Sequence, residues 1–173
     1  MPSDLIRVLS RDEIAQRIKA LANRISKDYV GKEICAIGVL KGAFIFLSDL
    51  VRQLTIPVQI DFVRLASYGD SAESSENVRI TKGIELDIRD RHVLVVEDIV
   101  DCGRTMAFLL EYLNGFHPKS VKVCALITKT ERREIDVPID YVGYGVEHGF
   151  LVGYGLDFAE KYRNLPEIYR IKV

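Results

Sequence analysis

The chain has 173 residues, of which 48% are hydrophobic and 28% charged, with a net charge of −1 and an isoelectric point of about 6.3. This balance excludes a disordered chain and disfavours a general nucleic-acid binder, which is usually basic. No apolar run is long enough for a membrane span, and no signal peptide is visible. The three cysteines are widely spaced, which argues against a disulfide framework and a structural zinc site. We expect one soluble domain over residues 1–173 in the reducing cytoplasm.

The first third of the chain predicts a helix followed by a strand, a second helix and a second strand. Residues 10–13 form a capping-box signature, and apolar residues then recur at helical spacing up to Ile25, so the sequence predicts an amphipathic helix that Gly31 ends. The later segments are a buried strand, a helix and a strand, over residues 34–40, 43–51 and 58–65.

Residues 67–77 are polar and small and have no apolar face. A segment of this length within a compact domain is usually a lid, a binding loop or disordered. Short strands are expected to flank it at residues 78–80 and 84–86.

The second half predicts further alternation of strand and helix. Residues 93–96 form the clearest buried strand, and a helix is expected over 106–114, ended by Gly115 and Pro118. Three more strands are expected, at 121–127, 141–144 and 151–154. This alternation predicts an α/β fold with a mostly parallel sheet.

The turn after the clearest strand carries the most specific chemistry. In open α/β sheets, ligands bind at the carboxyl ends of the strands. The small turn 101–105 contains Gly103, and its backbone N–H groups, the Thr105 hydroxyl and the start of the helix form an anion pocket suited to phosphate. Glu97 and Asp98 precede it, and their carboxylates would accept hydrogen bonds from a ribose diol or bind Mg²⁺. A sugar phosphate with a metal therefore fits the whole segment.

Other phosphate and hydrolase signatures are missing from the sequence. There is no GxxxxGK[ST] loop, no complete GxGxxG fingerprint, no HExxH and no GxSxG. The three histidines do not cluster in the sequence.

The segment Val-Glu-Asp-Ile-Val-Asp-x-Gly-x-Thr at residues 96–105 resembles the phosphoribosyl diphosphate (PRPP) motif of type I phosphoribosyltransferases, in the form of their hypoxanthine-guanine branch. Four more segments match in order: residues 39–44 resemble the family's pyrophosphate loop, 67–69 the start of its mobile loop, 150–157 its base-binding segment and 162–165 its C-terminal arginine segment. Lys129 also follows a strand, as the family's purine-contacting lysine does.

The resemblance implies the type I phosphoribosyltransferase fold with a small hood, and Mg²⁺-dependent transfer of 5-phosphoribosyl from PRPP to hypoxanthine or guanine, giving IMP or GMP and pyrophosphate. It also implies a homodimer or homotetramer that acts on small molecules, not on nucleic acid or membranes. In this family the Leu40–Lys41 peptide is typically cis.

The resemblance also implies a role for each matching residue. PRPP and its phosphates would be bound by Glu97, Asp98, Asp101, Cys102, Gly103, Arg104, Thr105, Lys41, Gly42 and Arg163. The purine would be bound by Lys129, Phe150, Leu151 and Asp157, and Mg²⁺ by Glu97, Asp98 and Asp157. Asp101 would act as general base, and Ser67 and Tyr68 would close over the reacting centre.

Two departures from the family pattern leave questions open. Cys102 stands where a hydroxyl residue is usual, and a thiol is a weaker donor, so somewhat weaker phosphate binding is expected. Glu147-His148-Gly149 replaces a Pro-Asp/Asn-Lys type of run, which leaves the preference among hypoxanthine, guanine and xanthine open. The alternatives are a xanthine-preferring enzyme and a PRPP-fold regulator that binds RNA and controls pyrimidine genes.

Overall fold

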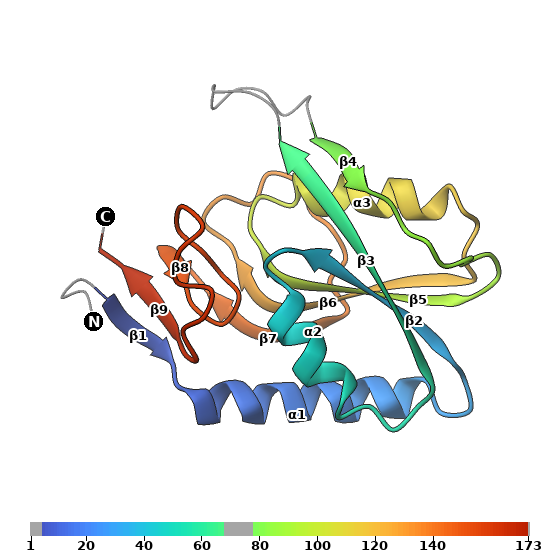
Figure 1. The fold of residues 1–173 in the computed structure, drawn as a ribbon, viewed down its shortest axis with the longest axis horizontal. Helices are drawn as coiled ribbons and strands as arrows, with labels where there is room; N and C mark the ends of the chain where they lie inside the picture. The colour runs from blue at the N-terminus through green and yellow to red at the C-terminus, as the bar shows by residue number, and fades with distance from the viewer. Residues whose placement is uncertain (1–4, 68–77, 173) are drawn as a thin grey trace.

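The computed structural model describes residues 5–67 and 78–172 (Figure 1). In chain order the elements are β1 (Leu5–Leu9), α1 (Arg11–Asp28), β2 (Ile34–Leu40), α2 (Phe44–Val51), β3 (Val58–Ser67), β4 (Val78–Lys82), β5 (His92–Val100), α3 (Arg104–Asn114), β6 (Ser120–Lys129), β7 (Tyr141–Val146), β8 (Phe150–Val152) and β9 (Ile168–Ile171). None of the helices in these ranges is both long enough and apolar enough to cross a membrane.

The central sheet has six strands in the order β4-β3-β2-β5-β6-β7. All neighbours are parallel except β3 and β4, which are antiparallel. The side chains of Val93–Val96 in β5 are fully buried, because this strand lies inside the sheet with both faces covered. The predicted α/β class with a mostly parallel sheet is confirmed.

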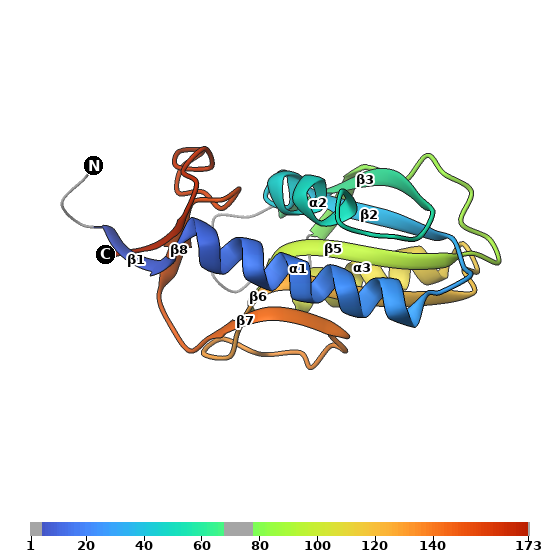
Figure 2. The same cartoon turned by 90° about the horizontal axis from the view of Figure 1, so that it is seen from below.

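Helices cover both faces of this sheet. On one face, α1 and α2 pack through residues such as Ile18 and Phe46, and on the other α3 packs through Leu109 and its neighbours (Figures 1 and 2). The start of α1 is the predicted capping box, since the Ser10 side chain accepts from the backbone of Glu13 and the Glu13 side chain accepts from the backbone of Ser10.

A second, three-stranded antiparallel sheet, β1-β9-β8, forms the small hood at the carboxyl ends of the parallel strands (Figure 1). Leu5 pairs with Ile171, so the two ends of the described chain lie side by side. The expectation of a strand over 151–154 is corrected to Phe150–Val152, because Gly153 has φ of +96° and turns the chain out of the sheet.

The expected strand over residues 84–86 is wrong. The backbone N–H groups of Glu85 and Leu86 donate to a carboxylate oxygen of buried Asp61 in β3, at 2.6 and 2.9 Å. These N–H groups are therefore satisfied by a side chain and not by a neighbouring strand.

Candidate active site

The acid pair and the phosphate-type turn lie together at the end of β5. A cavity of about 230 Å³ is lined by Glu97, Asp98, Asp101 to Gly103, Thr105 and their neighbours. Gly103 has φ of +88°, and a Cβ at this position would lie 2.2 Å from the Ile135 carbonyl oxygen. Only glycine fits there, and it allows the turn to lead directly into α3, whose first N–H groups are free to meet an anion.

Glu97 and Asp98 are both buried, and they have no ion pair with a cationic side chain anywhere in the described ranges. Burial, followed by the charge of Asp98, raises the pKa of the Glu97 carboxyl well above its ordinary value. Two adjacent buried carboxyls without a protein cation form a donor set that suits a hard divalent cation.

Asp98 and Asp157 both line a larger cavity of about 910 Å³, which hood residues such as Phe150 and Arg170 also line. Among the described residues, no three acidic, histidine or cysteine side chains form one cluster that could hold a metal by themselves. The carboxylates present can therefore provide part of a Mg²⁺ coordination shell, and ligand oxygens or water would have to complete it.

The larger cavity also contains Lys129 and Asp101, which are joined by an ion pair of 3.2 Å. Lys129 lies at the end of β6 and is only 6% exposed. One carboxylate oxygen of Asp101 accepts from Lys129, while the other, Oδ1, is buried and unpartnered. The pair therefore presents a donor and an unoccupied proton acceptor in the same cavity.

The hood supplies the other wall of this cavity. Phe150 of β8 is 45% exposed, and its ring packs edge-on against Phe158 at 5.4 Å between centroids. Leu151 and Leu156 line the same cavity. An exposed aromatic face beside a cavity is suited to stacking on a flat heterocycle.

The segment after β2 packs against Asp98, which lines both cavities. The Leu40–Lys41 peptide is cis, which confirms the expectation for this loop. A Cβ on Gly42 would lie 1.9 Å from the Asp98 carboxylate, and a Cβ on Gly155 would lie 2.1 Å from the Gly42 carbonyl oxygen. Three of the segments predicted to bind ligand, at residues 39–44, 96–105 and 150–157, therefore meet at Gly42.

Two predicted phosphate-binding cations are held together by one carboxylate. Glu160 accepts from Lys41 at 2.6 Å and from Arg163 at 3.2 Å. Arg163 also pairs with Asp157 at 2.9 Å and donates to the Gly155 carbonyl at 2.8 Å. The Glu160 carboxylate thus contacts the two cations, Lys41 and Arg163, that the family resemblance assigns to pyrophosphate binding.

Several predicted residues line neither cavity, among them Lys41, Gly42, Arg163 and Arg104. The Arg104 side chain is turned away to form an ion pair with Glu134, which leaves its backbone N–H at the start of α3. Ser67 is the last residue of β3, and Tyr68 lies outside the described residues, so the predicted closing role stays a prediction. The Cys102 carbonyl accepts from Glu134 and Ile135, which holds the turn in place whatever its thiol does.

The structure adds cavity residues that the sequence analysis missed, namely His148, Leu156, Arg170 and Lys172. Arg170 belongs to β9, a short strand whose hydrophobic pattern is too brief to be recognised. Its place in the cavity depends on pairing with β8 and could not be read from neighbouring residues.

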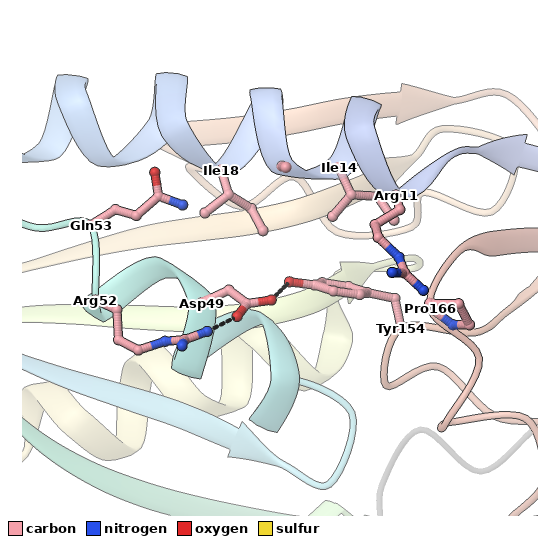
Figure 3. A pocket seen from close by; sticks show the side chains of 9 residues that line it. Arg11, Ile14, Ile18, Asp49, Arg52, Gln53, Tyr154 and Pro166 are labelled. Atoms are coloured by element: carbon pink, nitrogen blue, oxygen red, sulfur yellow. Dashed lines mark hydrogen bonds and ion pairs between the residues drawn. The ribbon is translucent and has the colours of Figure 1, made fainter.

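A separate cavity of about 370 Å³ lies between α1, α2 and the chain around Tyr154 (Figure 3). Its walls include Ile14 and Ile18 of α1, and none of the predicted site residues lines it. The Tyr154 hydroxyl donates to Asp49, which also pairs with Arg52. Tyr154, which belongs to the base-binding segment at residues 150–157, lines this cavity.

Comparison with known proteins agrees with this geometry. A family model described as "Phosphoribosyl transferase domain" matches residues 7–159. A hypoxanthine-guanine phosphoribosyltransferase from Aquifex aeolicus is 44% identical over 166 residues, covering 95% of this chain and 93% of that protein. A hypoxanthine phosphoribosyltransferase from Haemophilus influenzae is 40% identical over 167 residues, with the same coverage of 95% and 93%.

The solved structures agree with the sequence matches. A crystal structure of a Bacillus anthracis hypoxanthine-guanine phosphoribosyltransferase, with HEPES in its active site, is 41% identical, covers 98% of this chain and 100% of that chain, and has a TM-score of 0.94. The matched region contains the acid pair, the turn into α3 and the hood segment up to residue 159. The chain therefore belongs to the phosphoribosyltransferase family.

Proposed function

We propose that the protein is a hypoxanthine-guanine phosphoribosyltransferase that transfers 5-phosphoribosyl from PRPP to hypoxanthine or guanine and releases pyrophosphate. The main support is that two cavities adjoin and share lining residues. One has the acid pair and the phosphate-type turn, the other has the Lys129–Asp101 pair, and Asp98 and Asp101 line both. Such an arrangement can place a sugar phosphate and a purine next to each other.

The base cavity contains groups that match a 6-oxopurine. The Lys129 ammonium can donate to O6, which adenine lacks, and Phe150 can stack on the ring. Asp101 Oδ1 is buried and unpartnered, so it can accept a proton from the purine as N9 attacks the sugar. The ion pair with Lys129 keeps the other oxygen of Asp101 occupied and fixes the orientation of the carboxylate.

The pyrophosphate has its binding groups on the opposite side. Lys41, the backbone around Gly42, and Arg163 would hold it once the Glu160 carboxylate is displaced. Glu97, Asp98 and Asp157 would hold Mg²⁺, which when bound supplies Lewis acidity to the leaving group. The turn 101–105 with the start of α3 would hold the 5-phosphate.

We also propose that the whole chain acts as one domain in the cytoplasm and assembles as a homodimer or homotetramer. Its substrates are small molecules, and neither nucleic acid nor a membrane is needed for the reaction.

The decisive experiment mixes the protein with PRPP, Mg²⁺ and hypoxanthine, and follows the change in absorbance as IMP forms. Product formation supports the proposal. Absence of product with any purine would overturn it and would favour the RNA-binding regulator, which an RNA gel-shift assay then tests directly.

The Asp101→Asn variant tests the proposed general base. An amide keeps the size of the side chain and loses the proton acceptor, so turnover should fall by roughly 10²–10⁴. Binding of PRPP, followed by calorimetry, should change little. Turnover equal to that of the wild type would remove Asp101 from the reaction.

A further inference from the structure

Arg170 of β9 lies directly against the backbone that precedes Phe150. Gly149 has φ of +103°, and a Cβ built on it would lie 2.6 Å from Nε and 2.8 Å from Cδ of Arg170. The Arg170 side chain therefore fills the space that a side chain at position 149 would need. This is the stretch where Glu147-His148-Gly149 departs from the family's lysine-containing run.

The pairing of β8 with β9 brings Arg170 to the base cavity. Leu151 is the cross-strand partner of Arg170, and partners in an antiparallel pair project on the same side of the sheet. Both residues line the cavity of about 910 Å³ that also contains Lys129. Arg170 thus adds a cation to the wall formed by the base-binding segment.

Arg170 has no ion-pair partner among the described residues, in contrast to Lys129 and Arg163. Lys129 is paired with Asp101, and Arg163 with Asp157. The Nε atom of Arg170 is buried without a hydrogen-bond partner, and its guanidinium makes no ion pair within residues 5–67 and 78–172. A guanidinium beside a cavity and without a carboxylate partner has N–H groups available to donate to a ligand in that cavity.

We propose that Arg170 is a specificity-determining residue that biases base selection against guanine and towards xanthine and hypoxanthine. The inference rests on the proposed function and deepens it. A guanidinium only donates hydrogen bonds. When the Lys129 ammonium donates to O6 of the bound purine, the edge of the purine that faces β8 carries N1 and the substituent at C2.

The three bases differ at that substituent. Xanthine has a carbonyl oxygen at C2, which accepts from a guanidinium. Guanine has an amino group, which is itself a donor and leaves the Arg170 donor unpaired. Hypoxanthine has only hydrogen there. Arg170 should therefore favour xanthine most, hypoxanthine less and guanine least, since a site built around a donor penalises a ligand without the acceptor.

The test compares kcat/KM for the three bases in the wild type and in Arg170→Met, which keeps the apolar stem and removes the donor. We expect the ratio of xanthine to guanine to fall at least fivefold, and the ratio of hypoxanthine to guanine to fall in the same direction by less. Arg170→Lys should keep part of the wild-type ratio. If xanthine turns over too slowly, its inhibition constant against hypoxanthine replaces kcat/KM.

Arg132→Met is the matched control, because Arg132 lines the same cavity and carries the same charge. Its xanthine-to-guanine ratio should stay within twofold of the wild type. A change of less than fivefold in Arg170→Met, or an equal change in Arg132→Met, overturns the proposal. Because IMP formation by the wild type is measured in the same series, failure of the proposed function would be seen separately as loss of product with every base.

Discussion

At the scale of single residues, Glu97 has the most unusual environment, because it is buried beside a second carboxyl. Its pKa is raised by burial first and by the Asp98 charge second. A carboxyl whose pKa is higher in the folded state holds its proton more tightly there. It therefore adds stability below its ordinary pKa of about 4.5, and this contribution is lost as the pH rises through the folded-state pKa.

The Glu97→Gln variant should remove this pH dependence, since an amide has no proton to lose. Without Mg²⁺, the free energy of unfolding of the wild type should fall relative to the variant as the pH rises above the ordinary carboxyl pKa of about 4.5. Urea denaturation at several pH values measures it. Added Mg²⁺ should stabilise the wild type more than the variant at the upper pH, and parallel curves for the two proteins would contradict the account.

Glu160 occupies the cations that would bind pyrophosphate, so it competes with the ligand. Replacing it by Gln should release Lys41 and Arg163 and tighten pyrophosphate binding roughly two- to fivefold, the range typical of exposed ion pairs. Calorimetric titration with Mg-pyrophosphate measures this.

Glu33→Gln is the control, because Glu33 is an exposed acid just before β2, at the opposite end of the sheet, where it contacts Arg91 at 3.7 Å and accepts a hydrogen bond from Gln59 at 3.1 Å. It removes the same charge and should leave binding unchanged. Equal tightening in both variants would point to net charge and not to Glu160.

At the scale of elements, α2 and the base-binding segment are tied by the hydrogen bond from Tyr154 to Asp49. Burial and this bond raise the pKa of the Tyr154 hydroxyl, so it remains a donor at neutral pH. The next residue, Gly155, packs on the Gly42 carbonyl. The bond therefore holds the base-binding segment against the pyrophosphate loop.

Tyr154→Phe should cost about 1 kcal/mol of stability, because the half-buried Asp49 carboxylate loses a hydrogen-bond donor. It should also raise KM for both PRPP and hypoxanthine several-fold, because the packing of Gly155 against the Gly42 carbonyl weakens. Tyr169→Phe is the matched control, since Tyr169 also donates to a carboxylate, that of Glu167 at 2.7 Å. Similar KM values in the two variants would show that the Tyr154 bond has only a structural role.

The elements most readable from the sequence are those whose signals are local. The capping box predicted the start of α1, and the continuous apolar run predicted β5 with the acid pair at its end. The segment at 84–86 was misread because its N–H groups bond to Asp61, a residue more than twenty positions earlier. Likewise, β1 and β9 were missed because each is short and is stabilised by a partner from the opposite end of the chain.

At the scale of the whole molecule, the site is divided between two sheets. The central sheet carries the acid pair, the phosphate-type turn and Lys129, and their positions follow from the carboxyl ends of parallel strands. The hood carries Phe150, Leu151 and Arg170, which meet the central sheet only through tertiary packing. For that reason the sequence predicted the sugar-phosphate half of the site by itself, and identified the base half by resemblance to a family.

The pairing of β1 with β9 has a consequence for biosynthesis. β1 leaves the ribosome long before its partner, so it has no neighbouring strand until β9 has been translated. The six-stranded sheet needs nothing beyond β7 and can assemble on the nascent chain. The strands that position the acid pair, the phosphate-type turn and Lys129 can therefore form before the hood, and a translation product that ended after β7 would lack Phe150, Leu151 and Arg170.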